Sequence, residues 1–236
     1  MIGVAVVFAT LASYAVGWAI GVPVLLPILN TLASFPFMVL ALRRGDLRLA
    51  VARMLLWALT LGTVATLASY ARPDQTEALF LRSGPYRVEM LGWVMTGQGA
   101  ESTPSQFIPQ QAGHAALFSS LALVTGGAAA MPMGAVLMNY MGHYVGTLAA
   151  SSRRPALTMI LGWHPWSVIR VISFVVIGVV LSAPLLSRIG RFQVDWALGR
   201  RLLIWAGVGL IADVVLKTLL APAWQHLLLR VVGWTM

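Results

Sequence analysis

Residues 113–150 form one apolar run that carries polar groups in unusual places. It contains two histidines, an asparagine and four methionines, and none of its residues bears a formal charge. A helix needs roughly 20 apolar residues to cross a bilayer, so this run is too long for one crossing and slightly short for two. We predict a helical hairpin, with helices at 114–127 and 132–150 on either side of the Gly126–Gly127 break. A re-entrant segment at 114–127 is the alternative, and either arrangement places this run at the centre of a helix bundle.

The second half of the run has a distinct polar face. Asn139, His143 and Gly146 recur at helical spacing, so they share one side of a helix. Gly142 and Gly146 form a GxxxG pair, which lets another helix approach closely. Because a polar stripe is costly against lipid, we expect this face to look into the bundle.

The composition indicates an all-α, polytopic integral membrane protein. Of the 236 residues, 59% are hydrophobic and only 10% are charged, whereas a soluble domain carries about 25% charged residues. We therefore expect residues 1–236 to form a single transmembrane domain. The absence of cysteine excludes disulfides, thiolate metal ligands and a cysteine nucleophile.

About seven transmembrane helices (six to eight) are predicted. Besides the two in the hairpin, the apolar segments are 2–20, 24–42, 54–71, 165–186 and 201–220. Gly17 and Gly21 make a second GxxxG pair near the first turn. Such faces are candidates for a homo-oligomer or for other membrane subunits.

Two segments are predicted to lie outside the spans. The stretch 72–113 is expected to be an extracytoplasmic loop with an interfacial helix at 85–95 and an irregular portion at 97–113. Residues 221–236 are too short and interrupted for a crossing, and we expect an interfacial segment there.

Arginine-rich loops set the predicted orientation. The net charge is +9, and in short loops between apolar segments this favours topology and lipid headgroups over a nucleic-acid partner. With two crossings in the hairpin, the loops 43–53 and 188–201 lie on one side, which the positive-inside rule makes cytoplasmic. Arg153 and Arg154 fall on the other side, against the rule. The expected location is a prokaryotic plasma (inner) membrane.

This topology brings polar groups to one mouth of the bundle. The four histidines fall there, and Asp213 and Lys217 lie four residues apart on the last span, where they can pair. Ionisable residues inside a span suggest a functional site. The candidates for solute binding or proton coupling are Asn139, His143, Arg170, Asp213, Lys217 and Glu101.

Three functions fit these residues, and the first is favoured slightly. It is a small transporter or permease, alone or as a subunit, that moves a small solute or ion through a broken helical hairpin. The second is a membrane enzyme or subunit that binds copper, zinc or haem, with Glu101 as a general base over a metal-bound water. Its candidate ligands are His114, His143, His164, Met138 and Met141. The third is a scaffold subunit without chemistry of its own.

Overall fold

The computed structural model describes residues 2–234, and over that range the chain is helical throughout, without a β-strand. The elements in chain order are α1 (Ile2–Ile20), α2 (Leu25–Arg43), α3 (Leu47–Ala71), α4 (Pro73–Leu79), α5 (Ser83–Thr96), the 3₁₀ turn η1 (Ala100–Ser102), α6 (Pro104–Thr125), α7 (Ala130–Ala150), α8 (Pro155–Gly162), α9 (Pro165–Gly190) and α10 (Trp196–Val232).

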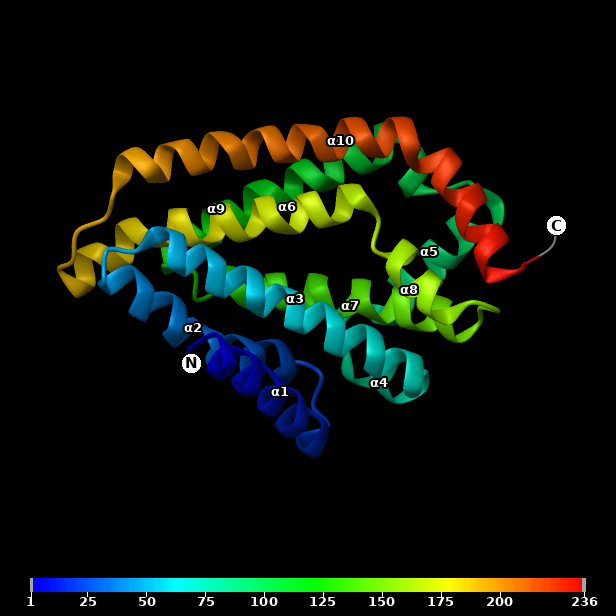
Figure 1. The fold of residues 1–236 in the computed structure, drawn as a ribbon, viewed down its shortest axis with the longest axis horizontal. Helices are drawn as coiled ribbons and strands as arrows, with labels where there is room; N and C mark the ends of the chain where they lie inside the picture. Colours follow the sequence, from blue (N-terminus) through cyan, green and yellow to red (C-terminus); the bar gives the residue numbers. More distant parts are fainter. Residues whose placement is uncertain (1, 235–236) are drawn as a thin grey trace.

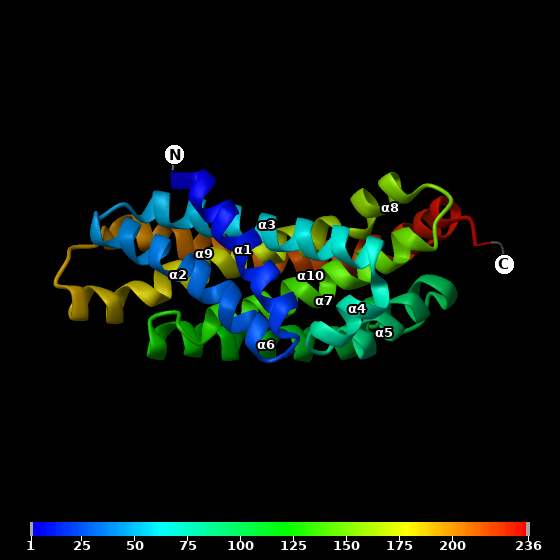
Figure 2. The same ribbon diagram turned by 90° about the horizontal axis from the view of Figure 1, so that it is seen from below.

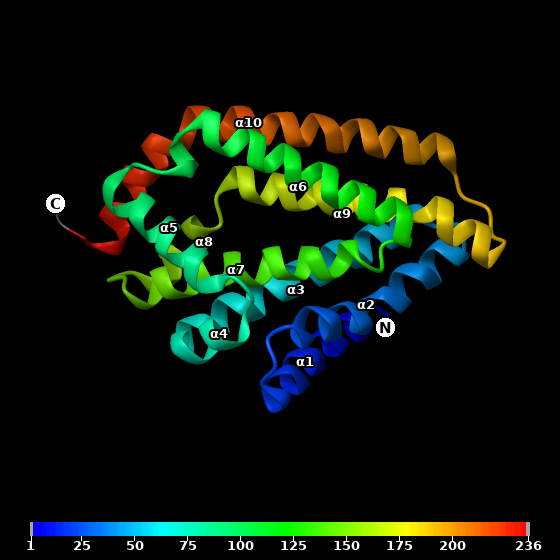
Figure 3. The same cartoon turned by 180° about the vertical axis from the view of Figure 1, so that it is seen from behind.

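The long helices pack in two layers (Figure 1). One layer holds α6, α9 and α10, and the other holds α1, α2, α3 and α7. The short helices α4, α5 and α8 gather at one end, near the C-terminal part of α10 (Figure 2). From behind, α6 runs alongside α9 (Figure 3).

Five helices are long and apolar enough to cross a membrane: α1, α2, α3, α9 and α10. This finding fits the predicted multi-pass helical class. The helices α6 and α7 have 22 and 21 residues, enough length for a crossing, but their polar residues lower their hydropathy. A total of seven crossings therefore stays a prediction.

The predicted hairpin is present. Gly126 and Gly127 adopt φ values of 61° and 90°, a backbone conformation that costs glycine little and other residues considerably more. Their N–H groups both close onto the carbonyl of Ala122, which ends α6 and turns the chain into α7. Pro132, at which the second predicted helix begins, lies in the first turn of α7, where its missing N–H is tolerated.

The glycines of α7 allow an unusually close helix contact with α3. A Cβ added at Gly142 would lie 2.5 Å from the Cβ of Ala65, and one at Gly146 would collide with the carbonyl oxygen of Thr66. The predicted polar face of α7 therefore does turn inward. Since α3 of the same chain covers this GxxxG pair, that face is already used within the chain.

Several predicted boundaries were wrong. The loops expected at 43–53 and 188–201 are shorter, because α3 begins at Leu47, α9 ends at Gly190 and α10 begins at Trp196. Residues 104–113, expected to be irregular, are the first turns of α6, since Pro104 occupies the favoured first helical position. Residues 221–232 continue α10 without a break through Pro222, although Figure 1 shows the helix bending in this portion. The last two residues of the predicted 221–236 segment lie outside the described residues.

The arginine-rich loops meet at one end of the bundle, as predicted. A Cβ placed on Gly45 would lie 3.7 Å from the carbonyl oxygen of Gln193. At the opposite end, Arg153 donates its backbone N–H to Val232 at 3.1 Å, and the Gln225 amide donates to the Val94 carbonyl at 2.6 Å.

Membrane sidedness is directly testable because the natural chain has no cysteine. Single variants Arg44→Cys and Gln193→Cys are expected to react with an impermeant maleimide from one compartment, and Gln98→Cys and Arg154→Cys from the other. All four side chains belong to exposed residues. Reaction of Arg44→Cys and Gln193→Cys from opposite compartments would contradict the arrangement.

Gly146→Val is expected to disrupt the contact between α3 and α7, because the added carbon atoms meet backbone. Overpacking usually costs about 1–3 kcal/mol, and the rigid neighbour places this change at the upper end. Thermal unfolding of the purified protein measures the loss. The control is Gly207→Ala on α10, where an added Cβ meets nothing within 4 Å.

Candidate functional site

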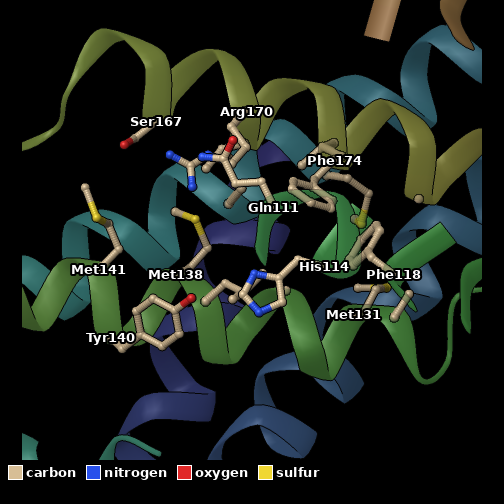
Figure 4. A pocket seen from close by; sticks show the side chains of 18 of the residues that line it. Gln111, His114, Phe118, Met131, Met138, Tyr140, Met141, Ser167, Arg170 and Phe174 are labelled. Carbon is tan, nitrogen blue, oxygen red and sulfur yellow. The ribbon is translucent and has the colours of Figure 1, made fainter. Parts of the chain in front are cut away.

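A cavity of about 150 Å³ lies between the two layers. Side chains of α2, α3, α5, α6, α7 and α9 line it, together with Lys217 of α10 and Glu101 of η1. Figure 4 shows Arg170, Gln111 and Tyr140 toward one part of it and Phe118 and Phe174 toward another. The cavity therefore has a polar end and an apolar arm.

A buried ion pair closes the polar end. The ammonium of Lys217 lies 2.7 Å from Glu101 Oε1, and the two residues are only 2% and 9% exposed. The same ammonium stands 4.3 Å above the ring of Phe107, where the ring's negative face adds attraction. Lys217 is thus held from η1 and α6, although it belongs to α10.

The ionisation of Glu101 depends on these neighbours. Burial alone would raise its pKa, but the positive charges of Lys217 and Arg170 outweigh that effect and lower the pKa below its ordinary value. Glu101 is therefore an anion at neutral pH. Its second oxygen, Oε2, is buried and has no hydrogen-bond partner within residues 2–234.

A second ion pair lies on the same side of the cavity. Arg170 Nε is 3.2 Å from Asp213 Oδ2, and Asp213 is buried. In the amide orientation that satisfies both neighbours, Gln111 accepts from Arg170 Nη1 at 3.2 Å and donates to Asp213 Oδ2 at 3.3 Å. Arg170 and Gln111 line the cavity, whereas Asp213 does not.

The expected pairing of Asp213 with Lys217 was wrong. Each residue pairs across helices instead, Asp213 with α9 and Lys217 with η1. The four-residue spacing correctly put both on the buried side of α10, but charged partners from neighbouring elements lie closer. The four charged residues, Asp213, Lys217, Glu101 and Arg170, nevertheless lie near one another. Their sequence positions had predicted this grouping.

Asn139 and His143 belong to other contacts. Asn139 accepts a hydrogen bond from the Tyr14 hydroxyl of α1. His143 Nδ1 lies 3.1 Å from Ser69 Oγ, and its Nε2 lies 3.5 Å from Glu77 Oε2. Neither residue lines the cavity, so the structure separates them from the charged group.

The candidate metal or haem ligands are spread over different surroundings. His114 lines the cavity with Met138 and Met141. The ring of His164 is stacked on Trp166, with centroids 4.7 Å apart, and His143 contacts α3 and α4. Within residues 2–234, no three His, Cys, Asp or Glu side chains are arranged to hold a metal ion.

Because 97–113 was predicted to be irregular, the contribution of α6 to the cavity lining was not predicted. Phe107, Gln111, His114 and Phe118 all line the cavity from α6. Their spacing of four, three and four residues is helical and was the signal that could have found them. Pro109 and the glutamines masked that period.

The fold and site define a class: a multi-helical protein with membrane-type helices around a cavity that has charged residues at one end. The comparisons with known proteins go no further, since no family model, curated protein or solved structure matches the chain.

The pair Glu101–Lys217 is expected to behave as a unit in a double-mutant cycle. Lys217→Met leaves a buried carboxylate unpaired, which costs about 3–5 kcal/mol of stability. Glu101→Gln combined with Lys217→Met removes both charges and should recover most of that loss. Thermal unfolding of Lys217→Met, Glu101→Gln and the double variant measures the coupling, and additive losses would contradict a direct pair.

Proposed function

We propose that this chain is a small transporter or permease, working alone or as a subunit, which moves a small solute or ion through the cavity between its two layers. The observation that carries the proposal is the placement of two ion pairs at one end of that cavity, the buried Lys217–Glu101 pair and the partly buried Arg170–Asp213 pair. Charged residues among apolar helices are costly and commonly mark a solute or ion pathway.

The ion pairs give the site a way to respond to a solute. A buried pair is favourable only while both charges have partners. A charged solute that binds Arg170 or Glu101 competes with the existing partners, Asp213 and Lys217, which come from α10. Solute binding therefore changes the contacts that join α10 to α9 and η1.

The proposed topology has seven crossings, with α6 and α7 added to the five most apolar helices. The helical hairpin, which is interrupted by glycines, is then similar to the discontinuous helices that form solute sites in transporters. The arginine-rich end, with the loops at 44–46 and 191–195, faces the cytoplasm by the positive-inside rule. The proposed location is a prokaryotic plasma (inner) membrane.

Proteoliposomes provide the test of transport. Uptake is measured for radiolabelled sodium, phosphate, glutamate and lysine, and transbilayer movement is measured for lysophosphatidylethanolamine with an impermeant amine reagent. At least one probe is expected to cross faster than in empty liposomes. The double variant Glu101→Gln with Lys217→Met should reduce that rate at least about tenfold, because it removes an ion pair with which the charged solute competes.

The matched control is His226→Ala, which changes an exposed residue at the same end of the bundle. Its rate should equal that of the natural chain. A folded protein that moves none of the probes, or a charge-free variant that moves them at the full rate, would contradict the proposal.

A further inference from the structure

We infer that the solute is a single-chain amphiphile with a zwitterionic head, an ammonium joined to a phosphate or carboxylate. This inference rests on the proposed transport function and names the chemical class that the same cavity accepts. The head lies among Arg170, Glu101 and Gln111, and the chain follows the apolar arm.

The charges of the cavity wall match a head of both signs. The lining includes Arg170, Lys217 and Glu101, together with the exposed Glu89, so groups of both signs border the polar end. Because Lys217 pairs with Glu101 and Arg170 with Asp213, a head of both signs adds no net charge to the site, whereas a singly charged head adds an uncompensated charge that is costly to bury.

Two spare hydrogen-bonding groups show where each part of the head fits. Glu101 Oε2 is a buried acceptor without a partner in the described chain, and it suits an ammonium. Arg170 lies at the wall with its side chain 26% exposed, so its guanidinium remains accessible to a phosphate or carboxylate. Gln111, which bonds the Arg170–Asp213 pair, orients the guanidinium.

The apolar arm fits a chain. Along α9 the lining runs from Ser167 to Ser182, a distance of about 22 Å at the helical rise of about 1.5 Å per residue. Beyond the polar end, the wall is made mainly of apolar and aromatic side chains and of glycines. The apolar part of this lining comprises Met38, Met54, Trp57, Phe118, Gly127, Met131, Gly134, Phe174, Val175, Gly178 and Val179. A small hydrophilic solute would leave this arm unfilled.

Native mass spectrometry in a nonionic detergent tests the assignment. The probes share one sixteen-carbon chain and differ in head: lysophosphatidylethanolamine, lysophosphatidic acid, hexadecylamine and monopalmitoylglycerol. The zwitterionic probe should bind the natural chain at least about tenfold more tightly than the others, because only its head can make charge-assisted hydrogen bonds to both Glu101 and Arg170. Free phosphoethanolamine should compete weakly.

Two variants separate the head from the chain. Arg170→Gln with Asp213→Asn removes one pair without leaving a lone charge, and it should reduce the preference for the zwitterionic probe over hexadecylamine. Gly134→Leu fills the arm at a position where an added Cβ has ordinary contact with Phe118, at 3.6 Å. This variant should weaken binding of the sixteen-carbon probe at least about tenfold and leave the affinity for the eight-carbon analogue unchanged.

The outcomes distinguish this inference from transport itself. Equal binding of all four heads, or competition by phosphoethanolamine as strong as by the lysolipid, would overturn the amphiphile assignment. If a hydrophilic probe crosses proteoliposomes under those conditions, the transport proposal stands with a different solute. If no probe binds and none crosses, both proposals fail.

Discussion

The arrangement of the α6, α9 and α10 layer depends on neutralising charge within an apolar bundle. Lys217 and Asp213 lie on the buried side of α10, where an unpaired charge is strongly destabilising. Their partners come from η1 and α9, so the positions of three elements are tied together by two ion pairs. Gln111 of α6 joins the second pair. The polar end of the cavity is therefore also where side-chain contacts join α10 to α9, η1 and α6.

The other layer is held by shape rather than charge. Gly142 and Gly146 bring α7 against the backbone of α3. On the same face, His143 shares a hydrogen bond with Ser69 of α3, and Asn139 accepts one from Tyr14 of α1. The two sides of α7 therefore make different contacts. One side packs against helices of its own layer, whereas Met138, Tyr140 and Met141 line the cavity.

Much of this was readable from the sequence because it rests on local rules. The Gly126–Gly127 turn, the inward face of α7 and the common end of the arginine-rich loops follow from backbone freedom, helical periodicity and charge placement. The partners of Asp213 and Lys217 were not readable, because they are set by how helices distant in the chain meet. Phe107 was missed, and Gln111 was assigned to a loop, for a different reason. Their helical period was present, but Pro109 outweighed it as a turn signal.

The close backbone contact between α3 and α7 has a mechanical consequence. Helices that touch backbone to backbone have no flexible side chains between them to absorb sliding, so this pair forms a stiff platform. The opposite layer meets the platform across a hollow, where fewer atoms resist displacement. A displacement of α6, α9 and α10 relative to α3 and α7 would therefore change the shape of the cavity before it disturbed the contact between α3 and α7.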